Sequence, residues 1–313
     1  MISVRFCRLT IPLLLLATGL CAAAAPTTQP SQSNHLPPHI QMLPDIRYGD
    51  GPGKSNLLDL YVPDAPDKPR PVVVWIHGGG WSAGDKAGFP AMSMVPHGYI
   101  AASINYRLSN QAVYPAQIQD CKGAIRFLRA HAKEYHIDPT RIGVWGASAG
   151  GHLVALLGTS VDSPELEGKV GGNLDQSSRV QAVCDWFGPT DLTQFADEAV
   201  AAGIIKTTPG PSLIMSLFGG SLKDKRDLVQ SANPIWFVNK KNAKSIPPFL
   251  IMHGDKDKMV PVAQSKLLDD ALVAAGASAE LQIIPGAGHG NGFTTPKITK
   301  MVTDFFDKQL KPN

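Results

Sequence analysis

The stretch from Gly146 to Gly150, with the sequence Gly-Ala-Ser-Ala-Gly, is well suited to covalent chemistry. It lies between an apolar run at 142–145 and a helix-like apolar segment at 151–157. A serine on a sharp turn from a strand into a helix exposes its hydroxyl, and the flanking glycines leave room for the turn. The helix N-terminus favours negative charge that develops nearby. The pattern therefore predicts that Ser148 attacks a carbonyl carbon, and a purely structural Gly/Ala turn is the alternative.

A glycine loop with the sequence His-Gly-Gly-Gly-Trp occupies residues 77–81, directly after an apolar run at 72–76. Backbone N–H groups in such a loop can stabilise the oxyanion of a tetrahedral intermediate, and each donor is worth about 3–4 kcal/mol of barrier. A phosphate loop of the Walker type would need Gly-Lys-Ser/Thr, which is missing here, and a flexible turn is the other alternative. We expect the N–H groups of Gly79 and Gly80, with that of Ala149, to hold the oxyanion.

A serine hydroxyl needs a base at neutral pH, usually a histidine held by a carboxylate. Among the nine histidines of the chain, His289 follows a strand-like run and lies in a glycine-rich loop that can reach Ser148. Structural roles are favoured for His77, His152 and His253. The orienting carboxylate is expected before His289, where residues 253–261 supply Asp255 and Asp257 as candidates.

The elements that must position these residues alternate between strands and helices. Apolar, β-branched runs without polar alternation are typical of parallel strands that are buried on both faces. We therefore predict an α/β fold with a mostly parallel central sheet covered by helices on both faces. A hairpin is expected from 45–48 and 56–62, strands at 72–76, 100–106, 142–145, 180–187, 248–252 and 281–284, and helices at 116–136, 262–275 and 296–311.

The alternation stops at about 191–233, where short helical segments and loops follow one another. Loops at the carboxyl ends of parallel strands shape the binding crevice. This insert is our candidate for a lid or the wall of an acyl pocket, and a passive surface excursion is the alternative. Trp81, Trp186 and Phe187 are candidate substrate-binding aromatics for a sugar or aryl group, although core packing explains each at least as well.

The first 25 residues have the pattern of a secretory signal peptide, with two arginines, an apolar run and small residues before the cleavage region. A lipid anchor at Cys21 is less favoured because Leu20 fits that processing poorly. We expect an exported protein, periplasmic or extracellular, without stable membrane association. Residues 26–44, rich in Pro, Gln, Ser and Thr, are predicted to be a flexible linker, and 45–313 one catalytic domain.

The composition and the motifs limit the classes of partner and cofactor that we expect for this protein. The chain has 29 Lys and Arg against 26 Asp and Glu, scattered without a basic stripe, so we expect no nucleic-acid partner. It lacks metal-ligand spacings such as His-Glu-x-x-His and has no dinucleotide fingerprint, so neither a metal nor a cofactor is expected. Cys121 and Cys184 are interpreted as buried thiols, with one disulfide as the alternative. The sequence leaves the oligomeric state open.

The order and wording of these motifs resemble the alpha/beta-hydrolase superfamily. The glycine loop at 77–81, the turn at Ser148, the 253–261 segment and the loop at His289 are similar to esterases of the hormone-sensitive-lipase type. They are more closely similar to the group that contains acetylxylan and feruloyl esterases, which the segments at 120–129 and 185–191 also resemble. The resemblance covers nearly all of the chain after about residue 45.

The resemblance implies an activity and completes the triad. Residues 253–261 are similar to the superfamily pattern His-Gly-x-x-Asp-x-x-Val-Pro, whose aspartate is the triad acid, so Asp257 takes that role and Asp255 is a turn residue. It implies a serine carboxylesterase acting on a small-molecule or polysaccharide ester, with acetyl or feruloyl groups on plant polysaccharide as the leading substrate. An amidase, peptidase or arylformamidase is the alternative within enzymes, and a non-catalytic binding protein is less favoured.

Overall fold

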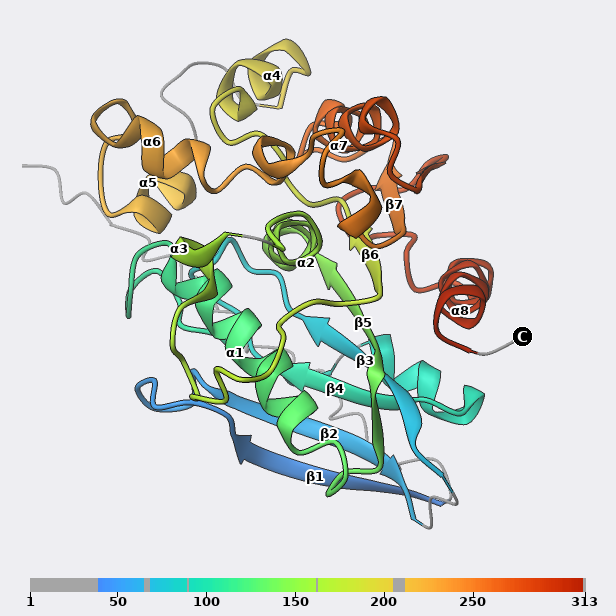
Figure 1. Cartoon of the computed structure of the whole chain (residues 1–313). Coiled ribbons are helices and arrows are strands. Elements are labelled where there is room, and N and C mark those ends of the chain that lie inside the picture. Colours follow the sequence, from blue (N-terminus) through green and yellow to red (C-terminus); the bar gives the residue numbers. More distant parts are fainter. Residues whose placement is uncertain (1–38, 65–67, 89, 162, 205–211, 312–313) are drawn as a thin grey trace, which may run out of the picture. The chain divides into compact units, whose positions relative to one another are not determined.

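The described part of the chain is built on one sheet. The computed structural model describes residues 39–64, 68–88, 90–161, 163–204 and 212–311 (Figure 1). The predicted signal peptide and the first part of the predicted linker lie outside these residues. Within them, eight strands form a sheet in the order β1-β2-β4-β3-β5-β6-β7-β8.

Strands β1 and β2 are antiparallel to each other, and β2 is antiparallel to β4, whereas the pairs from β4 through β8 are parallel. The strands are β1 (Ile40–Arg47), β2 (Leu57–Pro63), β3 (Arg70–Ile76), β4 (Ile100–Ile104), β5 (Ile137–Ala147), β6 (Ala182–Trp186), β7 (Phe249–Gly254) and β8 (Ala279–Ile284). The expected hairpin at the sheet edge and the mostly parallel sheet are both confirmed.

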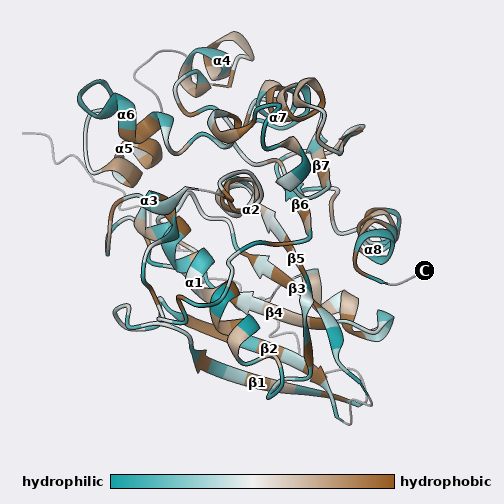
Figure 2. Cartoon of the chain, in the orientation of Figure 1, coloured by the Kyte–Doolittle hydropathy of each residue, from teal (hydrophilic) through white to brown (hydrophobic). Residues whose placement is uncertain are grey.

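Helices cover both faces of the sheet, because the central strands are apolar on both sides and both sides must be shielded from water. The longer helices are α1 (Ala116–Ala130), α2 (Ala149–Thr159), α7 (Val262–Ala275) and α8 (Pro296–Leu310). The helical segment η1 (Pro90–His97) and α8 pack on one face, and α1, α2 and α7 pack on the other. Apolar residues accordingly concentrate on the strands and on the helix sides that face them (Figure 2).

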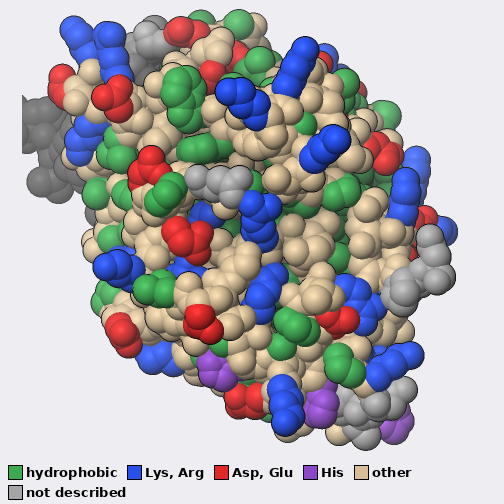
Figure 3. Space-filling view, in the orientation of Figure 1, with side chains coloured by type: hydrophobic (Ala, Val, Ile, Leu, Met, Phe, Trp, Pro, Cys, Tyr) green, Lys and Arg blue, Asp and Glu red, His purple; other side chains and the backbone are tan. Residues whose placement is uncertain are grey.

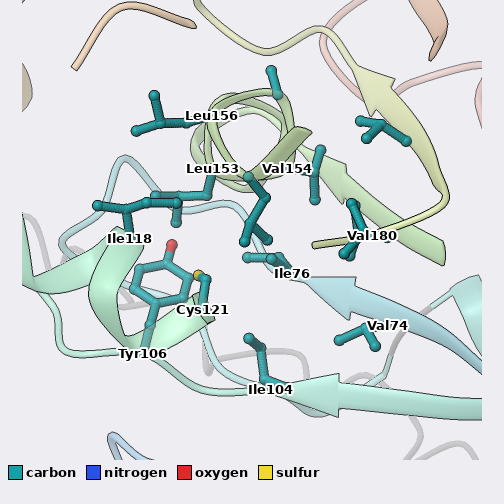
Figure 4. Packing of buried hydrophobic residues seen from close by; sticks show 14 of the residues in the cluster. Val74, Ile76, Ile104, Tyr106, Ile118, Cys121, Leu153, Val154, Leu156 and Val180 are labelled. Carbon is teal, nitrogen blue, oxygen red and sulfur yellow. The ribbon is translucent and has the colours of Figure 1, made fainter. Parts of the chain in front are cut away.

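The larger core cluster lies between the sheet and helices α1 and α2. Leu153 and Val154 of α2 face Val74 and Ile76 of β3, and Tyr106 fills the space beside α1 (Figure 4). Alternation along β3 sends Val73 and Trp75 to the cluster on the opposite face. Both faces of the central strands are therefore buried in the core, and this packing holds the ends of neighbouring strands in fixed positions relative to one another.

The predicted insert lies between β6 and β7 and contains short helices. These are α4 (Phe195–Ala201), α5 (Ser212–Phe218), η2 (Leu222–Lys225) and α6 (Arg226–Gln230), with η3 (Pro234–Phe237) and η4 (Ala243–Ser245) following; the short α3 (Pro164–Glu167) precedes β6. Helix α5 is strongly apolar (Figure 2).

Three boundaries differ clearly from the predictions, and one of them is the start of β5, at Ile137 rather than 142. Strand β1 begins at Ile40, so residues 40–43, predicted as linker, pair with β2. The linker prediction rests on the Pro-, Gln-, Ser- and Thr-rich residues before position 40, whereas Ile40, Met42 and Leu43 are apolar and form the start of an edge strand. Helix α1 ends at Ala130 rather than near 136, because the chain must reverse into β5, and it does so through His136 at φ +55°.

The surface carries mixed charge. On the face seen in Figure 3, Lys and Arg side chains alternate with Asp and Glu side chains. Among the described residues, no helix combines the length and the apolar character needed to cross a membrane. Cys121 and Cys184 are both buried and free, which confirms their interpretation as thiols rather than a disulfide.

Candidate active site

Ser148 occupies the turn between β5 and α2. Its backbone has φ 56° and ψ −122°, a strained conformation for a residue with a side chain. The turn is held because the Ser148 N–H donates to the Trp186 carbonyl at 2.9 Å. A Cβ on Gly146 would lie 2.4 Å from the Gly150 carbonyl oxygen, so the strand and the helix can meet this closely only with glycine at position 146.

Three side chains form a continuous hydrogen-bonded chain at the carboxyl end of the sheet. Ser148 Oγ lies 2.9 Å from His289 Nε2, and His289 Nδ1 lies 2.8 Å from Asp257 Oδ2. The three residues follow β5, β8 and β7, respectively. Parallel strands place their carboxyl ends on one edge, so residues far apart in sequence meet there. All three predicted triad residues are brought together.

Asp257 is held as a carboxylate. Its side chain is fully buried, and burial alone would raise its pKa. The pKa nevertheless lies well below its usual range, because the carboxylate accepts hydrogen bonds from His253, His289 and two backbone N–H groups. The N–H groups of Met259 and Val260 donate to Oδ1 at 2.7 and 2.9 Å. A charged acceptor is therefore fixed opposite the histidine ring.

The second candidate acid has a different function in the structure. Asp255 accepts the Gly286 N–H at 2.6 Å and so ties the loop after β7 to the loop after β8. Its side chain is partly exposed and lies outside the hydrogen-bonded chain. The interpretation of Asp255 as a turn residue agrees with this contact.

Behind the triad acid lies His253, which is completely buried. Its Nε2 is 3.1 Å from the Val260 carbonyl oxygen and 3.4 Å from Asp257 Oδ2. Its Nδ1 is 2.7 Å from Ser265 Oγ. With oxygens on both sides of Nε2, that nitrogen carries the proton and Nδ1 accepts from the hydroxyl. Sequence reasoning treated His253 as structural and missed that it supports the carboxylate.

The glycine loop passes directly against the serine. A Cβ on Gly78 would lie 3.3 Å from Ser148 Cβ and 2.8 Å from the Ala147 carbonyl oxygen. Gly79 and Gly80 have φ of +104° and +58°. Within the described residues, no acceptor takes up their N–H groups. Ala149 is the first residue of α2, so its N–H also lacks a helical acceptor. The three predicted oxyanion donors thus have unused N–H groups beside Ser148.

A cavity of about 260 Å³ opens beside Ser148 and His289. Its walls are mainly apolar, and four of the lining residues come from the insert. These four are Phe195, Ile204, Leu213 and Ile214. Their position favours the insert as the wall of a substrate pocket over a passive excursion. The other lining residues are Gly80, Trp81, Ala149, Pro189, Lys258, Met259 and Val260.

The three candidate aromatics have different positions. Trp81 lines the cavity, as predicted, although it is only 4% exposed. Trp186 does not: it lies in the core, with its ring near Trp75 and Trp145 and its indole N–H 3.2 Å from Met252 Sδ. Of the two alternatives for Trp186, substrate contact and core packing, the position of the ring supports core packing, because β6 is a central strand that is covered on both faces.

Phe187 also lies outside the cavity lining. It is 3% exposed, and its ring centroid is 4.6 Å from that of His289. It therefore supports the histidine ring from behind rather than contacting a ligand, which corrects its prediction as a substrate contact. The wall residues that sequence reasoning missed, such as Pro189 and Met259, carry no chemical signal that separates them from other apolar loop residues.

Comparison with known families shows to which family the chain belongs. The BD-FAE family model matches residues 58–272, well over half of the sequence. The chain belongs to the BD-FAE family. The BD-FAE match includes the glycine loop, Ser148 and Asp257. This agrees with the resemblance to alpha/beta-hydrolase esterases that the motifs predicted.

Individual relatives and solved structures are named as esterases or carbohydrate esterases. Esterase LipQ of Mycobacterium tuberculosis is 35% identical over 86% of this chain and 63% of LipQ. The chain thus spans about three fifths of the length of that curated relative. A truncated carbohydrate esterase from gut microbiota superposes with a TM-score of 0.77 at 33% identity, covering 87% of this chain and 97% of that one. A bifunctional GH43-CE protein of Bacteroides eggerthii gives 0.77 at 36% identity, covering 85% and 35%.

Proposed function

We propose that this BD-FAE family member is a serine carboxylesterase that hydrolyses short-acyl or aryl esters through an acyl-enzyme. The observation that carries the proposal is the hydrogen-bonded chain Ser148–His289–Asp257 beside an apolar cavity. A nucleophile, a base within 2.9 Å and a buried carboxylate at 2.8 Å from that base meet the geometric requirements of acyl transfer.

The first half of the reaction acylates the serine. Ser148 Oγ attacks the ester carbonyl carbon while His289 Nε2 takes its proton, and Asp257 stabilises the resulting imidazolium. The carbonyl oxygen becomes an oxyanion, which accepts hydrogen bonds from the N–H groups of Gly79, Gly80 and Ala149. Collapse of the intermediate breaks the C–O bond, and His289 returns its proton to the departing alkoxide. An alcohol leaves, and the acyl group stays on Ser148.

The second half releases the acid. A water molecule attacks the acyl carbon and gives its proton to His289 Nε2, and the same N–H groups hold the second oxyanion. His289 then protonates Ser148 Oγ as the acyl bond breaks. The products are a carboxylic acid and the free enzyme, and the histidine ends each half in its starting protonation state.

We propose that the enzyme is exported and that its substrate is an acetyl or feruloyl ester of a plant polysaccharide. The cavity volume lies just below the range of pockets that enclose drug-sized ligands, which suits one small acyl or aryl group. Two similar solved proteins of at least 33% identity are named as a carbohydrate esterase and a GH43-CE protein. These names support the carbohydrate substrate for this chain.

Hydrolysis of acetylated xylan, methyl ferulate and 4-nitrophenyl acetate tests the proposal. We expect the parent to release acid from 4-nitrophenyl acetate and from at least one of the other two. Ser148→Ala should lower kcat by about 10⁶-fold. Ser177→Ala, at an exposed serine outside the cavity lining, is the matched control and should keep full activity. Cleavage of 4-nitrophenyl acetate alone would remove both acetylated xylan and feruloyl esters as substrates, and a folded parent without esterase activity would overturn the mechanism.

A further inference from the structure

The glycine loop ends in a residue whose conformation needs support. Trp81 follows Gly79 and Gly80 and, like them, has a positive φ, +57°. Left-handed backbone is costly for a side chain of this size. Its backbone carbonyl accepts the Ser109 N–H at 2.7 Å, and its indole N–H donates to His152 at 3.2 Å. These two contacts anchor the end of the loop that carries the proposed oxyanion donors.

His152 is a completely buried histidine with both ring nitrogens engaged. Nδ1 accepts the Trp81 indole N–H, and the two rings meet edge-on with centroids 5.3 Å apart. Nε2 lies 2.7 Å from the Ala232 carbonyl oxygen and therefore carries the proton. Burial lowers the pKa of His152 to about 4, so the ring stays neutral near neutral pH.

His152 belongs to the same helix as the end of the nucleophile turn. Its own backbone N–H donates to the Ser148 carbonyl at 2.9 Å, one helical turn after the serine. One residue thus contacts the nucleophile turn through its backbone, the glycine loop through Nδ1 and the end of the insert, at Ala232, through Nε2. These three parts come from separate regions of the sequence.

We propose that His152 is a positioning residue that sets the place of the oxyanion donors relative to Ser148. The inference rests on the proposed function, because it assumes that Gly79 and Gly80 stabilise an oxyanion. A preorganised donor helps only if it lies at the correct position before charge develops. The Trp81–His152 hydrogen bond supplies this position from the helix that also carries the nucleophile turn. Loss of the acceptor leaves a buried indole N–H unpaired and frees the loop to shift.

The experiment compares three single variants, one double variant and one control by kcat, KM and unfolding midpoint, with 4-nitrophenyl acetate as substrate. The double variant combines His152→Leu with Trp81→Phe. His152→Leu removes both ring hydrogen bonds. His152→Gln retains an acceptor and a donor at a spacing close to that of the imidazole nitrogens. Trp81→Phe removes the indole N–H from the other side. His131→Leu, at a histidine of the α1 C-terminus that stacks on Phe127, is the matched control.

We expect His152→Leu to lower kcat by roughly 10- to 100-fold with KM nearly unchanged, a part of what a whole oxyanion donor contributes. His152→Gln should restore most of the kcat. Trp81→Phe should resemble His152→Leu, and the double variant should be no slower than the slower single variant, because both remove one interaction. His131→Leu should match the parent.

Four outcomes would overturn the inference. A folded His152→Leu protein with the parent's kcat would show that the contact only packs the core. Equal losses in His152→Gln and His152→Leu would show that hydrogen bonding is not the cause. Additive losses in the double variant would separate the two residues. If His152→Leu does not fold, an unchanged kcat for Trp81→Phe overturns the inference by itself. A parent without activity instead signals failure of the proposed function.

Discussion

At the scale of single residues, the triad acid is the assignment that most needs a direct test, because two aspartates stand two positions apart. Asp257 Oδ2 lies 2.8 Å from His289 Nδ1, whereas Asp255 accepts a backbone N–H from Gly286. Asp257→Asn keeps the size of the side chain but no longer fixes the tautomer that leaves Nε2 free to act as a base. We expect kcat to fall by about 10⁴-fold.

Asp255→Asn is the matched control for that measurement, because an amide oxygen can still accept the Gly286 N–H. Its kcat should stay close to that of the parent in steady-state assays of 4-nitrophenyl acetate. Comparable losses in both variants, or a larger loss in Asp255→Asn, would reverse the assignment.

A third aspartate, Asp185 on β6, is buried, and we expect its carboxyl group to make the free energy of unfolding depend on pH. Burial raises its pKa from 3.8 to about 7, while the Gly188 N–H donates to Oδ1 and its other oxygen has no partner among the described residues. The folded state therefore keeps a proton that the unfolded state loses above pH 3.8. This contribution to stability is complete below that pH and is lost as the pH rises toward 7.

Asp185→Asn removes this titration. Between pH 5 and pH 7 the unfolding free energy of the parent should fall relative to that of the variant by about 2–3 kcal/mol. Urea unfolding of both proteins at several pH values measures the difference, in which the other titrating groups cancel. Two parallel pH profiles would mean that Asp185 is charged in the folded protein.

At the scale of elements, the insert supplies four residues of the cavity wall, and we propose that it selects the acyl group. Leu213 of α5 lines the cavity and lies so close to the glycine loop that a Cβ on Gly80 would be 2.6 Å from its Cδ1. It therefore closes the cavity beside the expected oxyanion. Shortening this side chain should admit longer acyl groups.

We expect Leu213→Ala to raise the ratio of kcat/KM for 4-nitrophenyl hexanoate to that for 4-nitrophenyl acetate by about 10-fold, since each methylene in an apolar pocket is worth roughly 1–3 kcal/mol. Leu222→Ala, in the same insert but outside the cavity lining, should leave the ratio unchanged. An equal change in both variants would attribute the effect to general loosening of the insert.

The position of a residue on its strand or loop decides how much of the site can be predicted from the sequence. The triad residues can be predicted because local signals mark them, namely the spacing of nearby glycines and their position after apolar strands. The parallel sheet then brings the ends of those strands, and so the three residues, close together. The wall of the cavity has no such signal, since Phe195 and Ile214 look like any core residue. For Trp186 the sequence leaves substrate contact and core packing open, because its place on a central strand, rather than its chemistry, decides its exposure.

The supporting histidines show the same limit. The sequence favours structural roles for His152 and His253, and their contacts with Trp81 and Asp257 depend on tertiary packing. A buried polar ring must find partners, yet the sequence does not say which ones. Their part in positioning the site could be inferred only with the fold in hand.

At the scale of the whole molecule, the sheet divides the core into two clusters that do not share side chains. Cys121 of α1 belongs to the cluster on one face, and Cys184 of β6 belongs to the cluster on the other. The sheet therefore stands between the two sulfurs. A disulfide between them would require unfolding of the central strands, even in an oxidising compartment.

Burial makes both thiols unreactive as well, because it raises their pKa values well above the ordinary range and so suppresses the thiolate. In the folded protein, peptides containing Cys121 and Cys184 should remain unmodified by iodoacetamide, and both should be alkylated fully in concentrated urea. Addition of dithiothreitol should leave the unfolding midpoint unchanged. A reductant-dependent shift accompanied by a Cys121–Cys184 cross-linked peptide in mass spectrometry would contradict this arrangement of the two clusters. Alkylation of Cys184 alone under native conditions would instead locate local opening on the face covered by η1 and α8.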